Sequence, residues 1–364
     1  MRLKVPKTLV TFPNGREVLI YNYLTKKVMS CASENIYWLL GANEWTDIED
    51  ICQQHPDYDP QTIRTAIQEL VEGGALLIEG SEAAHIDATF ATSWELGPAA
   101  AMLHFSLLDN EYQTYEEGVA KQAARKLNDP SPQLFWKNEG VAVPLPRIKL
   151  GDQAGSLASM ARRRTRRNVT SEPVALVNLS ECLFAGLGIT GFVQTPTAAL
   201  PLKMAPGGGA RNAYEAYVWV RNVDGLEQGI YHYSAVEHSL QKLADSPNLP
   251  PQDLVQKQPW ADAMPVIIFL VAVLERVSWK YQDPNAYRVV MIEAGHIGQN
   301  MMLSATDNKL TLCPTAALNH REISQMLGLT KLTHTPVYAL TLGHPGENLD
   351  QIYCVSEGEK LAAA

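Results

Sequence analysis

The sequence lacks the marks of a nucleic-acid-binding, secreted or membrane protein. Its formal net charge is −9, from 39 acidic and 30 basic side chains, so it has no basic field to neutralise phosphates. No run approaches the roughly 18 apolar residues of a membrane-spanning helix, and the first residues show no signal-peptide pattern. The five cysteines are scattered without a CxxC or another metal-ligand spacing. We therefore expect a cytoplasmic protein with reduced thiols and no metal site.

What the sequence does contain is enough apolar material for two globular units. The chain has 364 residues, of which 46% are hydrophobic and 19% charged, as in ordinary globular proteins. Residues 8–30 form two alternating runs around Asn14-Gly15, which predicts a hairpin. Helices are expected after Ser33, from Thr46 and from Asp59-Pro60, followed by a strand, "ALLIEG". A hairpin, three helices and a last strand predict a small winged-helix domain over residues 1–83.

Winged helices often bind DNA through the third helix, and pattern alone leaves that alternative open. The third helix here offers Arg64 as its only cation and carries Asp59, Glu69 and Glu72. Such a helix repels phosphate, which argues against a nucleic-acid partner.

The rest of the chain divides into a connector and a second domain. Residues 84–155 are interpreted as a connector, partly helical and then rich in proline, and residues 156–359 as the second domain. The final "KLAAA", 360–364, has the character of a vector remnant. In the second domain helices are interleaved with strands without a regular βαβ alternation, which predicts an α+β fold.

Individual elements of the second domain can be predicted from capping and periodicity. We expect a helix from Ser156 to the basic cluster, another capped by Asn178 or Ser180 and stopped at Gly191, and a long helix over 286–310. Four runs of β-branched and aromatic residues predict strands: 215–223, 229–235, 265–274 and 337–344.

Two short segments stand out as possible ligand sites. Gly207-Gly208-Gly209 matches neither GxGxxG nor GxxxxGK, so taken alone it is more typical of a loop than of a nucleotide site. The cluster "RRRTRR" at 162–167 is either a solvated helix end, which is typical of charge runs, or a phosphate-binding site, for which the planar arginine guanidinium is suited.

The isolated histidines and the Lys280-Tyr281 pair do not indicate a function by themselves. His232 and His238 have poor metal-ligand spacing and are interpreted as structural, and His296 as a core histidine with a satisfied hydrogen bond. Lys280 and Tyr281 lie together in a proline-containing loop. No catalytic-triad, HExxH or paired-carboxylate pattern is found in the sequence.

Taken in order, four blocks between residues 156 and 345 resemble the SagB-type flavin-dependent dehydrogenases, a branch of the FMN-binding nitroreductase superfamily. The blocks are "RRTRRNV" (163–169), "MAPGGGARNAYEAYVWVRNVDGLEQGIYHYSAVEHSL" (204–240), "KYQDPNAYRVVMIEAGHIGQNMMLSA" (280–305) and "LCPTAALNHREISQMLGL" (312–329). The resemblance implies a nitroreductase-like fold, in which a central, mostly antiparallel sheet is flanked by helices. It also implies an FMN-dependent oxidoreductase.

The resemblance also assigns roles to particular residues. It implies that the FMN phosphate and ribityl chain are held by an arginine-rich set: Arg163, Arg164, Thr165 and Arg167. Pro206, Gly207, Gly208 and Gly209 would lie against the isoalloxazine ring, and the backbone amides of Ala316 and Ala317 would approach it near N5 and O4. Lys280 and Tyr281 match the pair with which azoline dehydrogenases assist proton removal as hydride moves to the flavin.

Three positions depart from the family pattern. Gly207 stands where the family usually has serine, Ala316-Ala317 replaces a segment that usually contains glycine, and His344 stands where most relatives have a basic residue.

The N-terminal pattern resembles the PqqD-like leader-peptide recognition element, which binds a peptide as an added strand. Together the two resemblances imply a homodimeric enzyme that oxidises azolines to azoles (thiazole or oxazole) in a ribosomally synthesised precursor peptide, with other maturation enzymes as further partners. Two alternatives stay open: a flavin-dependent reductase or another peptidyl oxidation on this scaffold, and a non-catalytic peptide-binding relative that lost its flavin.

Overall fold

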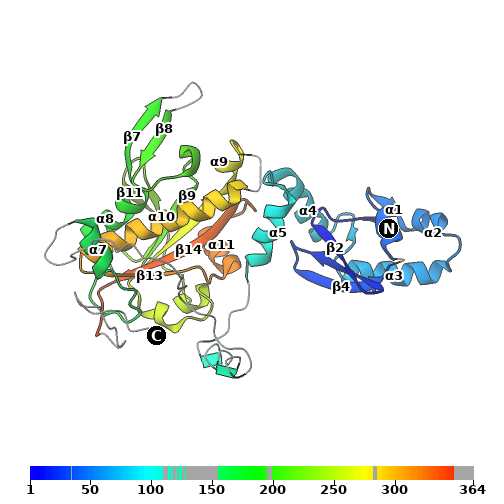
Figure 1. The fold of residues 1–364 in the computed structure, drawn as a ribbon, viewed down its shortest axis with the longest axis horizontal. Coiled ribbons are helices and arrows are strands. Elements are labelled where there is room, and N and C mark those ends of the chain that lie inside the picture. Colours follow the sequence, from blue (N-terminus) through cyan, green and yellow to red (C-terminus); the bar gives the residue numbers. More distant parts are fainter. Residues whose placement is uncertain are drawn as a thin grey trace, which may run out of the picture.

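The chain forms a small N-terminal part and a larger body. The computed structural model describes residues 1–33, 35–109, 114, 116–117, 120, 123–124, 127, 155–194, 199–281 and 285–347. In Figure 1 the blue strands and helices lie at one end of an elongated molecule, and the green-to-red elements form the body at the other end. Most of the second half of the expected connector and the final residues 360–364 lie outside the described residues.

The N-terminal part holds two antiparallel three-stranded sheets, ordered β2-β3-β4 and β5-β1-β6. Its elements are β1 (Arg2–Lys4), β2 (Leu9–Asn14), β3 (Glu17–Asn22), β4 (Lys27–Ala32), α1 (Asn35–Gly41), β5 (Thr46–Asp47), α2 (Ile48–Gln54), α3 (Pro60–Glu72) and β6 (Leu77–Ile78). The predicted hairpin is confirmed, since Asn14 pairs with Glu17 across a turn in which Gly15 has φ +66°.

Helix α3 begins where its sequence signals place it. The Asp59 side chain accepts the Thr62 amide at 3.1 Å, and Pro60 occupies the first turn. Ile63, Ile67 and Leu70 are fully buried against the N-terminal sheets. The helix expected from Thr46 was placed too early: Thr46 lies in β5, and Asp47 caps α2 by accepting the Glu49 amide.

Two further helices connect this part to the body. They are α4 (Glu82–Ser93) and α5 (Gly97–Leu107). An aromatic cluster joins them to Tyr23, the residue after β3, with the rings of Phe90 and Tyr23 6.2 Å apart and those of Phe90 and Phe105 5.7 Å apart. On its other side α5 reaches the body, where His104 Nδ1 lies 2.7 Å from the Tyr287 hydroxyl.

A six-stranded antiparallel sheet, ordered β11-β10-β9-β12-β14-β13, organises the body. The body's helices and strands are α7 (Ser156–Arg162), α8 (Leu176–Leu187), β7 (Ile189–Gln194), β8 (Ala199–Lys203), β9 (Tyr214–Val220), β10 (Gly229–Ser234), β11 (Ser239–Ala244), β12 (Val266–Val273), α9 (Leu274–Ser278), α10 (Asn285–Asp307), β13 (Thr311–Thr315), α11 (His320–Leu327) and β14 (His334–Gly343). Short 3-10 turns are η1 (Gly208–Ala210), η2 (Pro251–Leu254) and η3 (Pro259–Ala263).

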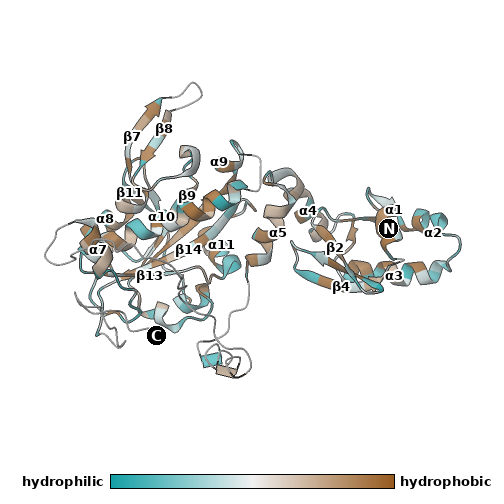
Figure 2. Cartoon of the chain, in the orientation of Figure 1, coloured by the Kyte–Doolittle hydropathy of each residue, from teal (hydrophilic) through white to brown (hydrophobic). Residues whose placement is uncertain are grey.

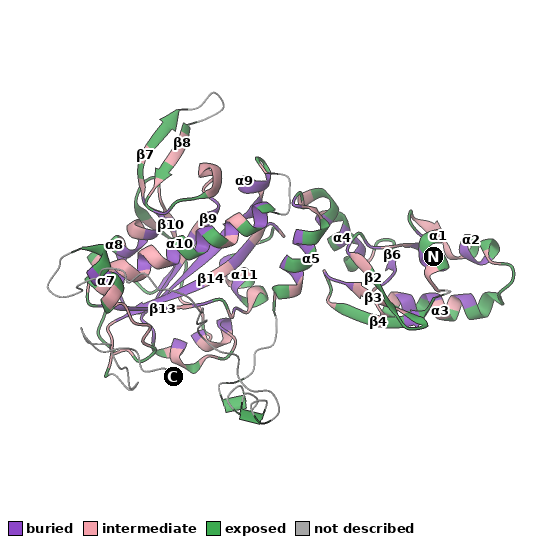
Figure 3. Ribbon diagram, viewed as in Figure 1, coloured by how far each residue is buried: buried purple, intermediate pink, exposed green. Residues whose placement is uncertain are grey.

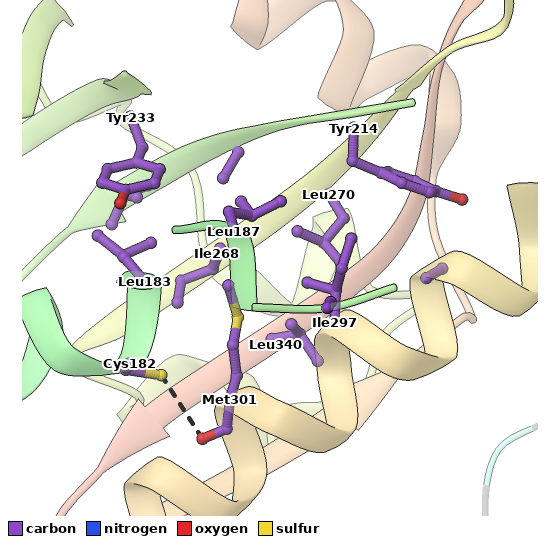
Figure 4. Packing of buried hydrophobic residues seen from close by; sticks show 14 of the residues in the cluster. Cys182, Leu183, Leu187, Tyr214, Tyr233, Ile268, Leu270, Ile297, Met301 and Leu340 are labelled. Atoms are coloured by element: carbon purple, nitrogen blue, oxygen red, sulfur yellow. Dashed lines mark hydrogen bonds between the residues drawn. The ribbon is translucent and has the colours of Figure 1, made fainter. Parts of the chain in front are cut away.

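The centre of the body is closely packed on both faces of this sheet. All eight residues of β12 are buried, and Figure 3 shows the central strands in the buried colour. One face packs on α8 and α10, where Ile297 and Met301 meet Leu183 and Ile268 (Figure 4). The Cys182 thiol there donates to the Met301 carbonyl oxygen at 3.7 Å. The other face packs on η2, η3 and α11.

The predicted α+β fold with a mostly antiparallel sheet is confirmed, with corrections at helix ends and edge strands. Helix α8 begins at Leu176, so Asn178 and Ser180 lie inside it and Gly191 lies in β7. It begins early because Val174 is fixed by backbone hydrogen bonds to residues 222 and 224. Strands β7, β8, β11 and β13 were not predicted. No helix in the described residues is long and apolar enough to cross a bilayer.

The β7–β8 ribbon projects from the body (Figure 1), and much of it is hydrophobic in Figure 2. Phe192 and Leu202 are 56% and 50% exposed.

Candidate functional site

The arginine-rich segment follows α7 and runs beside the edge strand β13. Arg162 closes α7 and pairs with Asp307, at the end of α10, at 3.0 Å. Beyond it the Arg166 amide donates to Thr311 Oγ1 at 3.2 Å. Arg167 lies close enough to Cys313 to oppose the effect of burial, which raises the pKa of that thiol to about 11. The segment is therefore anchored along β13 by its backbone and by Arg167.

The predicted phosphate-binding residues lie close together at this place. Arg163 Nη1 donates to Thr165 Oγ1 at 3.2 Å, and Arg164 Nη1 donates to the Ala161 carbonyl oxygen at 2.8 Å. Within the described part of the chain, no carboxylate forms an ion pair with Arg163 or Arg167. Uncompensated guanidinium charge held in a fixed geometry suits an anionic group such as a phosphate.

The Ala316-Ala317 pair directly follows the end of β13. The Ala317 amide donates to Thr315 Oγ1 at 3.1 Å, so this donor is already occupied. Ala316 is exposed, and its amide has no hydrogen-bond partner in the part of the chain that the structure describes. One of the two predicted backbone donors is thus available to a ligand.

The segment between β8 and β9, residues 204–213, is called the glycine loop, and it packs along one face of α10. A Cβ at Gly207 would lie 2.7 Å from Glu293 Oε2, and one at Gly208 would lie 2.2 Å from Val289 Cγ1. His296 Nδ1 donates to the Pro206 carbonyl oxygen at 3.3 Å. The three α10 residues are spaced so that they share one helix face. The loop thus approaches the helix closely at both glycines, against the Glu293 carboxylate at Gly207 and against Val289 at Gly208.

The third glycine faces the predicted catalytic pair. Gly209 has φ +66°, and a Cβ there would lie 2.7 Å from the Tyr281 hydroxyl and 2.9 Å from Lys280 Nζ. Lys280 Nζ lies 5.1 Å from the centre of the Tyr281 ring, within the range of a cation–π contact. The structure thus brings Lys280, Tyr281 and the glycine loop together. On the same side, the Arg211 guanidinium lies 4.5 Å from the ring of the exposed Trp279.

Two ionisable side chains, the buried Glu293 and the half-buried Lys203, contact the glycine loop. Burial raises the pKa of Glu293, although Lys203 and the amides of Ala213 and Gly208, which donate to the carboxylate, oppose this. Burial also lowers the pKa of Lys203, which donates to Asn212 Oδ1. The Gly208 amide is consequently engaged with Glu293.

A second buried carboxylate lies in the adjoining strand. Burial acts to raise the pKa of Glu215, but hydrogen bonds from His232 and Arg276, with the charge of Arg276, outweigh it and hold the pKa below its ordinary value. Arg276 Nη2 lies 2.6 Å from Glu215 Oε1, and Arg276 Nη1 donates to the Asn212 carbonyl oxygen. This network fixes the end of the glycine loop on β9 and α9.

The predicted site residues fall into two groups on one chain. The glycine loop and Lys280-Tyr281 lie at the first half of α10, and the arginine segment lies at its end. Asp307 lies fourteen positions after Glu293, which is about 21 Å of helix at 1.5 Å per residue.

The histidine assignments were right in part. His232 bonds to Glu215 at 2.8 Å and His238 to Ser180 and Tyr233, as expected of structural residues. His296 is exposed, so the expectation of a core histidine was wrong. Glu293 and His104 were missed. The only available signal was the helical spacing of Glu293 with His296 in one block.

Comparisons with known proteins agree with this architecture. Residues 160–344, half of the chain, match the family model described as "Nitroreductase family". "Putative nitroreductase MJ1384" of Methanocaldococcus jannaschii is 32% identical over 188 residues, covering 50% of this chain and 88% of that protein. "Trifolitoxin-processing protein TfxB" of Rhizobium leguminosarum bv. trifolii is 28% identical over 151 residues, 40% of each chain.

A likeness in fold extends further along the chain. A chain of the E. coli microcin synthetase McbBCD complex with truncated pro-MccB17 bound aligns with a TM-score of 0.50 at 15% identity. The alignment covers 73% of this chain and 93% of that one, a larger share than residues 160–344. With its antiparallel sheet, its long helix and its match over half of the sequence, the chain belongs to the nitroreductase family.

Proposed function

We propose that this protein is an FMN-dependent oxidoreductase that dehydrogenates a ribosomally synthesised precursor peptide, converting an azoline to an azole. The observation that carries the proposal is the convergence of Lys280 and Tyr281 on the glycine loop at Gly209. Nitroreductase membership supports the redox chemistry. The names of two similar proteins, one processing trifolitoxin and one a microcin synthetase bound to its precursor, support a peptide substrate.

The residues present fit an FMN group. Arg163, Arg164, Thr165 and Arg167 would hold its phosphate and ribityl chain, and the unpartnered Ala316 amide would donate to the ring. Bound FMN supplies a two-electron acceptor for the hydride that leaves the azoline. Pro206, Gly207, Gly208, Gly209 and Ala317 shape the remaining wall, chiefly through backbone.

Lys280 and Tyr281 would handle the proton that leaves the azoline ring. Lys280 is exposed and Tyr281 half-buried, so the amine can reach a peptide while the phenol is held by the loop. A base and an orienting hydroxyl within reach of one carbon are what proton removal beside a hydride transfer requires.

A second copy of the chain would join the two halves of the site. On one chain the arginine segment and the glycine loop lie at different positions along α10, and Ile292, on the outer face of that helix, is 51% exposed. A homodimer that buries this face would bring the loop of one protomer to the arginine segment of its partner. A monomeric mass by light scattering would contradict this arrangement.

The N-terminal part, proposed as a winged-helix domain over residues 1–83, would bind the leader peptide in the PqqD-like manner. β4 is the outer strand of its sheet, and four of its six residues are exposed, so it can accept an added strand. Residues 84–155 would serve as the connector and 156–359 as the flavin domain. The described cysteines are free and buried, which agrees with a cytoplasmic location.

Two variants test the proposed roles separately. Arg164→Ala should lose the flavin absorbance bands of the purified protein, and Lys280→Ala should keep them but lose turnover of an azoline peptide. Arg64→Ala and Lys331→Ala, whose side chains form exposed salt bridges, are the matched controls. Turnover by Lys280→Ala at the wild-type rate would show that the pair has another role.

A non-catalytic peptide-binding role is the second candidate. It is favoured by the occupied amides of Gly208 and Ala317, which remove two donors from any flavin. A yellow purified protein would rule it out. A reductase on the same scaffold would instead show a nicotinamide requirement.

A further inference from the structure

A cavity of ≈ 390 Å³ lies on the side of α10 that faces away from the glycine loop. Tyr287, Met291, Ala294 and Gly295 line it, and Val289, Glu293, His296 and Asn300 meet the loop. At 3.6 residues per turn these two sets lie roughly 180° apart around the helix. The cavity is therefore separate from the glycine loop, although Ala316 places it beside the predicted flavin ring.

The walls of the cavity are mainly apolar. Leu107 and Leu108 at the end of α5 form one wall, and Pro336, Val337 and Tyr338 of β14 form another. Among the described residues, no lysine, arginine, aspartate or glutamate lines it. Its volume is at the lower end of the range for small-molecule pockets, which suits one large side chain.

One buried polar side chain also lines the cavity and is incompletely paired. His104 is 1% exposed, and its Nε2 has no hydrogen-bond partner in the described part of the chain, while Nδ1 is engaged by Tyr287. Burial, with a smaller contribution from His320, lowers the pKa of His104 to about 3, so the imidazole is neutral at pH 7. A buried polar atom without a partner calls for an explanation, and a ligand group in the cavity supplies one.

The α5 wall continues into the N-terminal part. Ser106 and Tyr21 share a hydrogen bond of 2.8 Å, and Phe105 packs on Phe90 beside β3. A peptide held by the N-terminal sheet would thus be anchored on a unit that also forms one wall of the cavity.

We propose that this cavity is a specificity pocket for a large, uncharged, mainly apolar side chain of the substrate peptide, near its reacting residue. This assignment rests on the function proposed above, since a peptide substrate supplies the occupant. A lining without lysine, arginine, aspartate or glutamate selects against lysine and glutamate side chains, and His104 offers one hydrogen bond to a phenol, indole or amide.

Gly295 makes the pocket testable without disturbing the fold. A Cβ at Gly295 would meet nothing within 4 Å, and its φ is not in the left-handed region. Gly295→Leu therefore fills the cavity while raising helix propensity. Leu107→Trp fills it from the opposite wall, since Leu107 is 52% exposed. Ala88→Leu adds the same side chain at an exposed position of α4 and is the control.

The measurement is saturation-transfer NMR on the full chain with single-residue probes. N-acetyl-phenylalaninamide and N-acetyl-tyrosinamide should receive saturation from the wild type at least fivefold more strongly than N-acetyl-lysinamide or the glutamate analogue. The signal should be lost in Gly295→Leu and Leu107→Trp, reduced in Gly295→Ala, and kept in Ala88→Leu. Equal signals for charged and aromatic probes, or an unchanged signal in both filled variants, would overturn the pocket.

Flavin content is measured on the same samples by visible absorbance. Loss of flavin in Gly295→Leu, with flavin kept in Ala88→Leu, would assign the cavity to the cofactor and overturn the proposal. Wild-type protein without flavin would refute the proposed redox function, while the probe result would still decide the pocket.

Discussion

Gly208→Ala tests whether the glycine loop is shaped by its contact with α10. The backbone at Gly208 is outside the left-handed region, so an alanine there with no neighbour would stabilise the fold by about 0.4–1 kcal/mol through the unfolded state. The new Cβ would instead lie 2.2 Å from Val289 Cγ1, whereas carbon atoms rest at about 3.5–4.0 Å. Valine in a helix has one strongly preferred rotamer, so it cannot readily turn away.

The contact with Val289 therefore makes Gly208→Ala destabilising instead of stabilising. Overpacking of this kind costs about 1–3 kcal/mol. After the unfolded-state gain is subtracted, we expect a net loss of about 0–2.6 kcal/mol in the free energy of unfolding. For a domain of this size, each kcal/mol lowers the melting temperature by about 2–4 °C.

Urea denaturation at 25 °C, followed by circular dichroism, measures the change. Val289→Ala removes the opposing methyl groups, so Gly208→Ala made in that background should be neutral or stabilising. The two substitutions should couple by about 0.5–3 kcal/mol, the range for residues in contact. A stabilised Gly208→Ala single variant would show that the triplet is a plain turn and that the approach of the loop to α10 is not what requires glycine.

Two further predictions concern buried ionisable groups in the body. The pKa of His104 is lowered to about 3 in the folded state, so its contribution to stability is present above its ordinary pKa of 6.5 and falls by about 1.4 kcal/mol per pH unit as pH drops below that value. His104→Gln should remove this dependence of the free energy of unfolding on pH from urea titrations between pH 6.5 and 4.5. A dependence identical to that of the wild type would count against a neutral buried imidazole. Burial raises the pKa of Glu293 above 4.5, so its contribution to stability is greatest below pH 4.5 and is lost as pH rises through the raised folded value. The free energy of unfolding of Glu293→Gln, relative to that of the wild type, should therefore be higher at pH 7 than at pH 4.5. The reverse trend would mean that the Lys203 charge dominates.

Strong local signals predicted much of the fold. The β12 strand reads as eight consecutive apolar residues, and Asp59-Pro60 combines a capping side chain with a favoured first residue, so both were found. The edge strands were missed for a physical reason. β11 is mostly exposed and β13 contains Pro314, so neither shows the alternation of a half-buried strand.

The site was less accessible to sequence reasoning because its contacts are long-range. The His104 and Tyr287 side chains meet across 183 residues of sequence, and local pattern says nothing of such a pair. The approach of Gly207 to Glu293 likewise depends on how β8 leads the chain back onto α10. Resemblance supplied the association of Lys280 and Tyr281 with the glycines, and the structure supplied the contact at Gly209.

The two-sided use of α10 constrains how this protein can change over evolutionary time. Inserting one residue between Met291 and His296 would rotate everything beyond it by about 100° relative to the preceding turns. His296 and Asn300 would then leave the loop, while Val289 stayed on it. A substitution can change the residues on one face of the helix without affecting the other face. An insertion or deletion between these contacts changes both faces at once, so it needs compensating changes in both the loop and the cavity. We expect homologous sequences to vary freely in the β7–β8 ribbon and to keep this helix free of gaps.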